Sequence, residues 1–515
     1  MWSWAQNLQR PKFNRDWVSR KLRIVKKFAL FILTIAWFLP MAAPAKAENP
    51  SATKQLQIIE SIIEINGKEY PVFDLIQKDG SWGFTGQKGE LFDIELKNST
   101  REPVSIHWHG LKMPFSASGE ECVSELPLLP GEFRYYRFPL NQSGTYWMHA
   151  LNKEKQQRLL AAPLIVHEPE QAWVLQDQVV LFQEFSAQEP AIINSKLRRK
   201  LQSEFLHKLA YQQDQDYDAL LINRRTVSEP IVFHLFPGEP VKLRFINATN
   251  NSPLRLFFGG IEGTVTAVDG REIEPLQLPD LQLAQGQRAD VVLVMPESSG
   301  VYTVLAKVAG RKLQNGLVLA SPGQEIPAIA SKAEFSSLPL DLELEKLLVS
   351  KQAIISTEPQ KIAEVQLAEN SHEKETEKNN EEMDQMLEVE FDGDLHTYVW
   401  TINGQVWPKI IPLQVKQNKL TTLRLKNSSP LPQAVFLTGH DFQVTSINGE
   451  QQRGAIRDSF YLPGGSSITV TFVTDNPGAW LVRGSIPYSL DDDLTTTINY
   501  QGIKLPQFYL DQINL

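Results

Sequence analysis

The stretch Val104-Ser-Ile-His-Trp-His-Gly110 places two histidines two residues apart in a β-rich segment. Side chains at positions i and i+2 leave a strand on the same face, so His107 and His109 can point at one common object. A second β-rich run, Gly144-Thr-Tyr-Trp-Met-His-Ala150, brings in His149. Neutral imidazoles that converge from two strands are suitable ligands for copper or zinc. The sequence therefore predicts a candidate metal site at His107, His109 and His149.

The same pattern has a second interpretation that needs no metal. The histidines lie beside Trp108 and Trp147, so they could be packed core residues. Buried imidazoles of this kind satisfy their ring nitrogens by hydrogen bonds within the protein. The spacing of the histidines does not by itself separate the two interpretations.

The rest of the chain predicts an all-β fold. From Gln55 onward, short β-rich runs alternate with turns rich in Gly, Pro, Asn and Asp, which is typical of sandwiches and barrels. We expect three β-sandwich domains, at residues 48–170, 171–323 and 391–515. Apolar residues at helical spacing in 193–213 predict a helical insertion in the second domain.

Residues 324–390 differ from these domains and are expected to form a linker. The part at 370–382 is strongly charged and has no apolar side chains. A segment of this composition cannot bury a core, so we expect the linker to be partly disordered.

The first 47 residues have the features of an export signal. A basic region, Arg20 to Lys27, precedes the nearly unbroken apolar run 28–43, and Ala45-Lys46-Ala47 matches a cleavage site. We expect an exported, periplasmic protein with no stable membrane span after cleavage, although an uncleaved anchor remains an alternative. Removing this segment takes the formal net charge from −9 to −17, which argues against nucleic acid as a partner.

Motifs in family order make the chain resemble the three-domain multicopper oxidases, most closely their bacterial copper-resistance branch. The resemblance spans nearly the whole mature chain. Its motifs are His107-Trp-His-Gly110 and Gly144-Thr-Tyr-Trp147 in the first unit, Arg244-Phe-Ile-Asn247 and Asp269-Gly270 in the second, and Gly439-His440, Arg457-Asp458 and Asp475-Asn-Pro-Gly-Ala-Trp480 in the third. The resemblance implies three cupredoxin-like Greek-key β-sandwiches.

The same resemblance implies that most copper ligands are missing. Members oxidise a substrate at a type 1 copper and reduce dioxygen at a trinuclear copper cluster. Alignment on Gly439-His440 and on Trp480-Leu481 leaves other residue types at the ligand positions of the third domain. In the first domain, the second His-x-His motif retains His149 and has Leu151 in place of the other histidine. The third-domain residues are Gln433, Phe436, Thr438, Arg483, Gly484, Ser485, Ser489 and Leu494. The single cysteine, Cys122, is not at the type 1 ligand position.

These substitutions lead to an expected function without oxidase chemistry. The type 1 site depends on a cysteine thiolate, and Arg483 would place a positive charge where a metal ligand stood. We expect a degenerate family member without a cofactor, acting as a binding or scaffold protein on an envelope partner. The role expected is in cell division or envelope stability, as in copper-free family members. The alternative is a copper-binding, copper-resistance or residual oxidase protein that holds one copper ion at the His107, His109 and His149 remnant.

Overall fold

The computed structural model describes residues 53–169, 176–189, 192, 217–250, 252–354, 385–394, 399–485 and 494–513. The expected signal at 1–47, the helical insertion at 193–213 and the charged stretch at 370–382 lie outside the described residues. The described chain is built almost wholly of strands, which confirms the all-β expectation. Among the described residues, no helix is long and apolar enough to cross a membrane.

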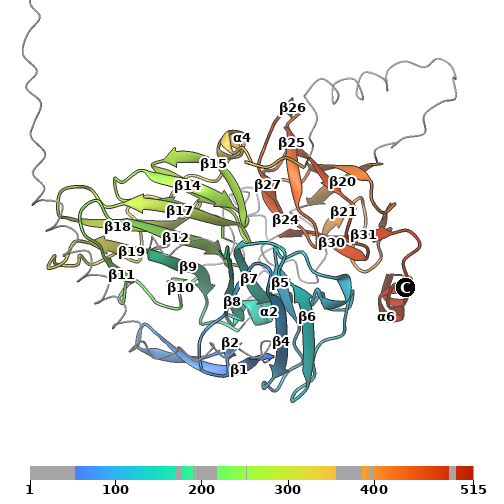
Figure 1. Cartoon of the computed structure of the whole chain (residues 1–515), viewed down its shortest axis with the longest axis horizontal. Helices are drawn as coiled ribbons and strands as arrows, with labels where there is room; N and C mark the ends of the chain where they lie inside the picture. Colours follow the sequence, from blue (N-terminus) through green and yellow to red (C-terminus); the bar gives the residue numbers. More distant parts are fainter. Residues whose placement is uncertain are drawn as a thin grey trace, which may run out of the picture. The chain divides into compact units, whose positions relative to one another are not determined.

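The first sandwich contains two four-stranded sheets (Figure 1). One sheet has the order β2-β1-β4-β6 and the other β3-β8-β7-β5. Their bounds are β1 (Lys54–Ile65), β2 (Lys68–Gln77), β3 (Phe84–Gln87), β4 (Leu91–Asn98), β5 (Ile106–His109), β6 (Phe133–Pro139), β7 (Gly144–Ala150) and β8 (Ala161–His167). Two short helices accompany them, the 3-10 helix η1 (Phe115–Ala117) and α2 (Lys153–Gln157).

The second sandwich pairs a six-stranded sheet with a five-stranded sheet. Their strand orders are β10-β9-β12-β17-β14-β15 and β11-β19-β18-β13-β16. The bounds are β9 (Gln176–Phe185), β10 (Ala219–Ile222), β11 (Val232–His234), β12 (Pro240–Asn247), β13 (Leu254–Phe257), β14 (Gly263–Val268), β15 (Arg271–Leu278), β16 (Asp280–Leu283), β17 (Arg288–Val294), β18 (Val301–Val308) and β19 (Gln314–Ala320).

The third sandwich repeats this plan. One sheet follows β21-β20-β23-β29-β25-β26 with β27 paired to β25, and the other follows β22-β31-β30-β24-β28. The bounds are β20 (Gln385–Asp394), β21 (Val399–Ile402), β22 (Leu413–Val415), β23 (Leu420–Asn427), β24 (Gln433–Leu437), β25 (Phe442–Ile447), β26 (Glu450–Gln451), β27 (Ile456–Arg457), β28 (Ser459–Leu462), β29 (Ser467–Val473), β30 (Ala479–Ser485) and β31 (Thr495–Tyr500). The helix α6 (Gln507–Ile513) follows.

Both ends of the expected linker, 324–390, are folded. At its C-terminal end, β20 starts at Gln385 and pairs in parallel with β23 of the third sandwich. Near its N-terminal end, the helix α4 (Glu343–Leu347) presents the buried Glu345, whose carboxylate accepts hydrogen bonds from Arg457 at 3.0 Å. Charged composition marks only the middle of this range, because the flanking residues find partners in the sandwiches.

Alternating burial marks strands with one covered face, and continuous burial marks strands with both faces covered. In β23 every second residue is buried, as expected when one face of a strand covers a core. All four residues of β5 are buried. Trp108 on one face of β5 joins the core, while His107 and His109 on the other face line a cavity between the sandwiches. Strand β5 therefore lies between the core of the first sandwich and the cavity, with both of its faces buried.

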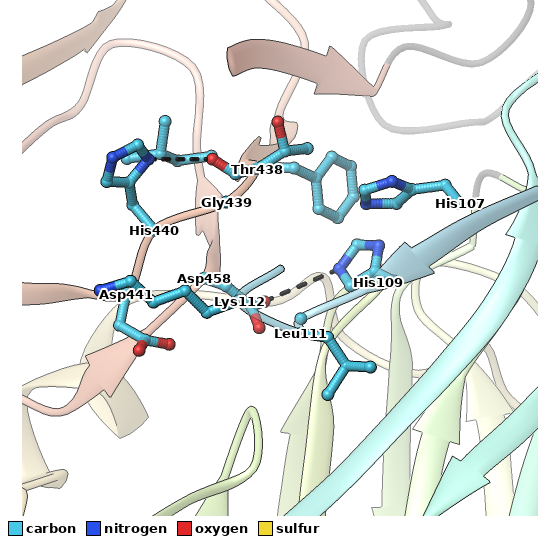
Figure 2. A pocket seen from close by; sticks show the side chains of 12 residues that line it. His107, His109, Leu111, Lys112, Thr438, Gly439, His440, Asp441 and Asp458 are labelled. Atoms are coloured by element: carbon cyan, nitrogen blue, oxygen red, sulfur yellow. Dashed lines mark hydrogen bonds and ion pairs between the residues drawn. The ribbon is translucent and has the colours of Figure 1, made fainter. Parts of the chain in front are cut away.

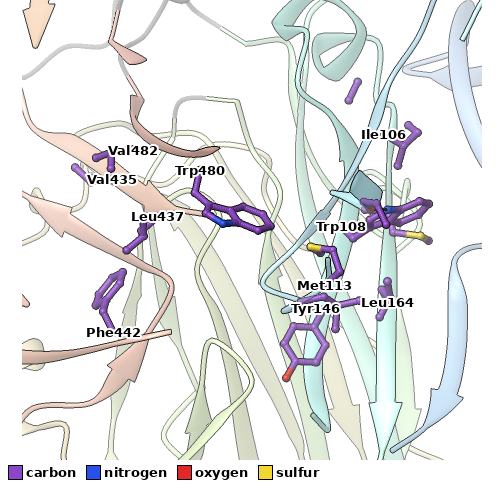
Figure 3. Packing of buried hydrophobic residues seen from close by; sticks show 14 of the residues in the cluster. Ile106, Trp108, Met113, Tyr146, Leu164, Val435, Leu437, Phe442, Trp480 and Val482 are labelled. Carbon is purple, nitrogen blue, oxygen red and sulfur yellow. Dashed lines mark hydrogen bonds between the residues drawn. The ribbon is translucent and has the colours of Figure 1, made fainter. Parts of the chain in front are cut away.

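One continuous hydrophobic cluster contains buried side chains of both the first and the third sandwich. Figure 3 shows Trp108 and Tyr146 from the first sandwich and Trp480 and Phe442 from the third. Phe115 of η1 packs edge-on against Trp480, with ring centroids 5.6 Å apart. The two sandwiches therefore share a core rather than meeting only through a polar surface.

A buried arginine on β17 joins all three sandwiches. The Arg288 guanidinium donates to both carboxylate oxygens of Asp458, at 2.6 and 2.5 Å, and its Nε donates to the carbonyl of Thr145 at 3.1 Å. Asp269 of the second sandwich lies 3.5 Å from the same guanidinium. Arg288 has no exposed surface, so these contacts must replace its whole hydration shell.

We expect the substitution Arg288→Met to destabilise the protein by about 3–5 kcal/mol, because it leaves the Asp458 carboxylate buried and unpaired. Urea unfolding measures the change. The matched control is Arg137→Met, since Arg137 is 68% exposed and its pair with Asp93 should contribute about 1 kcal/mol or less. The double variant Arg288→Met with Asp458→Leu should recover part of the loss. Equal stability of Arg288→Met and Arg137→Met would contradict this prediction.

Candidate metal centre and interdomain cavity

The structure brings the three predicted histidines together. Strands β5 and β7 are antiparallel, and their register places His107 directly opposite His149. The ring centroids of His109 and His149 are 5.4 Å apart, and those of His107 and His149 are 5.8 Å apart. All three side chains are buried and line one cavity of about 70 Å³.

Backbone carbonyls set the tautomers of two of these imidazoles. The Nδ1 of His107 lies 2.9 Å from the carbonyl oxygen of Ser118, and the Nδ1 of His149 lies 2.9 Å from that of Ala150. A carbonyl oxygen only accepts, so each Nδ1 carries the proton and donates. The neutral rings therefore leave Nε2 as a bare Lewis base. The Nε2 of His149 lies 3.2 Å from the Nδ1 of His109.

The other nitrogen of His109 faces the interdomain ion pair. Its Nε2 is 3.7 Å from a carboxylate oxygen of Asp458, as Figure 2 shows. Burial alone would raise the pKa of Asp458, but attraction to Arg288 outweighs it and holds that pKa below its usual range. The candidate site is thus connected to the interdomain ion pair through a single imidazole.

All three imidazoles are held neutral. Burial, with a smaller contribution from the neighbouring His109, lowers the pKa of His107 to about 3. Burial also lowers the pKa of His109, against the opposing effect of Asp458, and places that of His149 well below its usual range. Neutral imidazoles are the form that binds metals.

The opposite wall of the cavity comes from the third sandwich. Strands β24 and β30 pair so that Phe436 lies opposite Arg483, and both line the cavity with Thr438, Gly484 and Ser485. The Phe436 ring meets the His109 ring edge-on, with centroids 5.2 Å apart. Arg483 Nη1 donates to the carbonyl of Leu151 at 3.5 Å. Five of the third-domain residues expected at lost ligand positions thus line the same cavity as the retained histidines.

Comparisons with known proteins identify the family of the chain. Three family models described as "Multicopper oxidase" match residues 84–171, 194–321 and 375–501. The chain belongs to the multicopper oxidase family. Multicopper oxidase MmcO of Mycobacterium tuberculosis is 23% identical over 431 residues, covering 80% of both chains. Copper resistance protein A of Escherichia coli is 24% identical over 311 residues, which cover 53% of this chain and 50% of that protein.

Solved structures of the family show the same fold. A laccase from Botrytis aclada matches with a TM-score of 0.69 and 18% identity, covering 89% of this chain and 90% of that chain. A multi-copper oxidase from Pseudomonas thermotolerans matches with a TM-score of 0.63 and 21% identity, covering 87% and 100%. The expected fold of three cupredoxin-like sandwiches is therefore confirmed.

The multicopper oxidase type 1 site does not fit the residues present. A Cβ built on Gly484 would lie 3.2 Å from the Gln433 amide oxygen, 3.2 Å from Leu494 and 3.0 Å from the Phe391 ring. The three positions aligned with type 1 ligands thus converge, but they supply no thiolate and no imidazole. Both amide atoms of Gln433 lack a hydrogen-bond partner in the described residues. The fourth position, Ser489, lies outside the described residues.

The single cysteine lies in a different place. Cys122 lines a second chamber of about 120 Å³ and adopts a left-handed backbone conformation with φ of 60°. The chamber shares Leu151, Leu481 and Arg483 with the histidine cavity. Cys122 is not among the residues that line the histidine cavity.

The trinuclear cluster does not fit the cavity either. Phe436, Thr438, Arg483 and Ser485 supply no imidazole, and no group of three or more His, Cys, Asp or Glu side chains within the described ranges is arranged to hold a metal ion. The separation of 3.2 Å between the nitrogens of His109 and His149 matches two ligands at about 2.0–2.1 Å from one ion. The retained histidines therefore offer one pair of donor nitrogens, from His109 and His149, and His107 lies beside this pair.

Several residues of the site were not found from the sequence. The sequence around Arg288 does not indicate a buried ion pair, because a lone arginine in a strand is compatible with many structural roles. Asp458 was noted only as part of the Arg457-Asp458 motif. Glu120 is fully buried near the cavity wall, and burial raises the pKa of its carboxyl group to about 8. Only the tertiary contacts reveal these roles.

The buried histidines predict a loss of stability in acid. Burial holds the pKa of His107 near 3 and lowers that of His440 to about 4, whereas an unfolded histidine titrates near 6.5. Below pH ~6.5 these histidines bind protons in the unfolded chain but stay unprotonated in the folded protein. As the pH falls below about 6.5, each buried histidine should therefore lower the free energy of unfolding by up to about 1.4 kcal/mol per pH unit. This loss levels off near the pKa of that histidine in the folded protein.

Unfolding free energies measured between pH 7 and ~4 test this expectation. The variant His440→Gln removes one titrating group outside the histidine cavity and should show a shallower pH dependence. The same slope in both proteins would contradict the assignment of His440 as a buried neutral residue.

Proposed function

We propose that this protein is an exported multicopper oxidase homologue that has lost oxidase activity and acts as a binding or scaffold protein of the cell envelope. The observation that carries the proposal is the type 1 position. There Gly484 meets Gln433, Leu494 and Phe391 instead of a thiolate and imidazoles. A soft cysteine sulfur creates the redox behaviour of a type 1 copper. Without it, the protein lacks the copper at which family members oxidise their substrate.

The charge in the cavity supports the same proposal. Arg483 contributes a fixed guanidinium opposite the histidines and lowers the pKa values of His107 and His149, after the larger effect of burial. A fixed positive charge opposes the binding of a divalent cation nearby, and the opposition grows in a site of low dielectric. The cavity is thus electrostatically unlike a copper cluster site.

The periplasmic location and the partner are part of the proposal. The basic and apolar segment before residue 48 supports export, and a protein without redox chemistry keeps its surfaces for binding. Cell division or envelope stability is the role proposed for such a scaffold. Cell fractionation should recover the protein in the envelope or periplasm, and recovery in the cytoplasm would contradict the proposal.

The purified protein should show no oxidase activity after copper loading. We expect no blue absorption from a thiolate-bound copper and no oxygen uptake with phenols or cuprous ion, because the type 1 ligands are missing. Metal content after dialysis, absorption spectra and an oxygen electrode provide the measurements. Four bound coppers with a blue colour and oxygen uptake would overturn the proposal.

A second candidate function is the binding of one copper ion. The paired nitrogens of His109 and His149, with the bare Nε2 of His107 nearby, favour it. In this case His109 and His149 would hold the ion, and the ion would be carried rather than used for redox chemistry.

If the second function holds, the protein retains about one copper per chain, as expected for a site with few imidazole donors. The variants His109→Ala and His149→Ala should lose the ion. The control His167→Ala should keep it, because His167 ends β8 and does not line the cavity. Arg483→Ala should bind copper more tightly by removing a nearby positive charge. Equal metal content in all four variants would exclude the site.

A further inference from the structure

Two adjoining chambers meet at Arg483. The inner chamber of about 70 Å³ contains the histidines, and the outer chamber of about 120 Å³ contains Cys122. Both are lined by Arg483, Leu151 and Leu481. A cavity needs about 10–15 Å³ of such volume to hold one water molecule, so the outer chamber has room for more than a single water.

Strand register places a hydroxyl beside the guanidinium. Thr495 of β31 lies opposite Arg483 of β30 and also lines the outer chamber. Thr495 is only 4% exposed, and its hydroxyl has no hydrogen-bond partner among the residues that the structure describes. A buried hydroxyl without a partner is costly, because it gives up its hydrogen bonds to water. It therefore points to a ligand.

The other walls of the outer chamber define the chemical class of that ligand. Val123, Trp407 and Leu481 form an apolar side, whereas Arg483, Thr495 and Gln512 provide polar groups. The planar fork of an arginine matches the two oxygens of a carboxylate. Glu121 lines the same chamber and repels any anion, but it repels a dianion such as phosphate about twice as strongly as a monocarboxylate.

We infer that the outer chamber binds a small monocarboxylate with a short apolar chain. The carboxylate accepts hydrogen bonds from Arg483 and Thr495, and the apolar chain lies against Trp407 and Leu481. The inference rests on the proposed function, because it requires that Arg483 faces a cavity free of a copper cluster. It adds the class of ligand that this cavity would recognise.

Cys122 allows a direct test, because it is the only cysteine of the chain and lines the chamber. Alkylation by iodoacetate or iodoacetamide forms a carbon–sulfur bond to Cys122, releases iodide, and leaves the thiol proton in solvent. The two reagents differ mainly in the carboxylate. Their rate ratio therefore cancels any change in thiolate reactivity that a variant causes.

In the full-length protein, the ratio of the iodoacetate rate to the iodoacetamide rate should be higher for Cys122 than for a small free thiol in solution. Butyrate should slow both reactions, with inorganic phosphate much less effective. In Arg483→Gln the preference should disappear and the apparent Kd for butyrate should rise roughly tenfold or more, as expected for loss of a charge-assisted pair. Arg137→Gln, an exposed change on β6, should behave like the wild type.

Thr495→Val keeps the size of the side chain and should weaken butyrate binding with Arg483 intact, so the test does not depend on one variant. Thermal unfolding checks that each variant is folded. No protection by butyrate in the wild type, or an unchanged reagent ratio in Arg483→Gln, would overturn the inference. Four bound coppers would overturn both this inference and the proposed function, whereas a copper-free protein without butyrate protection would overturn only the inference.

Discussion

The Arg288–Asp458 ion pair is the constraint on which the central geometry depends. A guanidinium with no exposed surface must find a partner for each of its donors, because an unpaired buried charge costs several kcal/mol. Thr145, Asp269 and Asp458 supply those partners from three different sandwiches. Each sandwich must therefore lie where its acceptor meets Arg288, and the cavity walls are positioned with it.

The same ion pair explains the glycine at the end of the His-Trp-His-Gly motif. Gly110 has a φ of 87°, and a Cβ at this position would collide with both the Arg288 guanidinium and the Asp458 carboxylate. A larger residue would be strained in its backbone and would separate the pair. The motif is thus partly an adaptation to the interdomain junction, and this requirement persists without copper. The family pattern at Gly110 therefore carries no information about whether a metal is bound.

Regular patterns allowed much of the fold and half of the site to be predicted. Alternating hydrophobicity predicted the strands, and the spacing of His107 and His109 placed their side chains on one face, where His149 joins them across β5 and β7. The burial of Arg288 and the folded ends of the linker range could not be predicted. Both depend on partners that are distant in sequence, and no local pattern records such partners.

The sequence by itself determined which chemical groups are available: three imidazoles in strands of the first sandwich, one cysteine away from the aligned ligand position, and a guanidinium at residue 483. Only the tertiary structure decided what these groups face. Backbone carbonyls select the tautomers of His107 and His149, burial keeps the rings neutral, and the pairing of β24 with β30 sets Arg483 beside Phe436. The reason is physical, because tautomer, pKa and donor convergence depend on distance and solvent exclusion, which exist only once the sandwiches have packed.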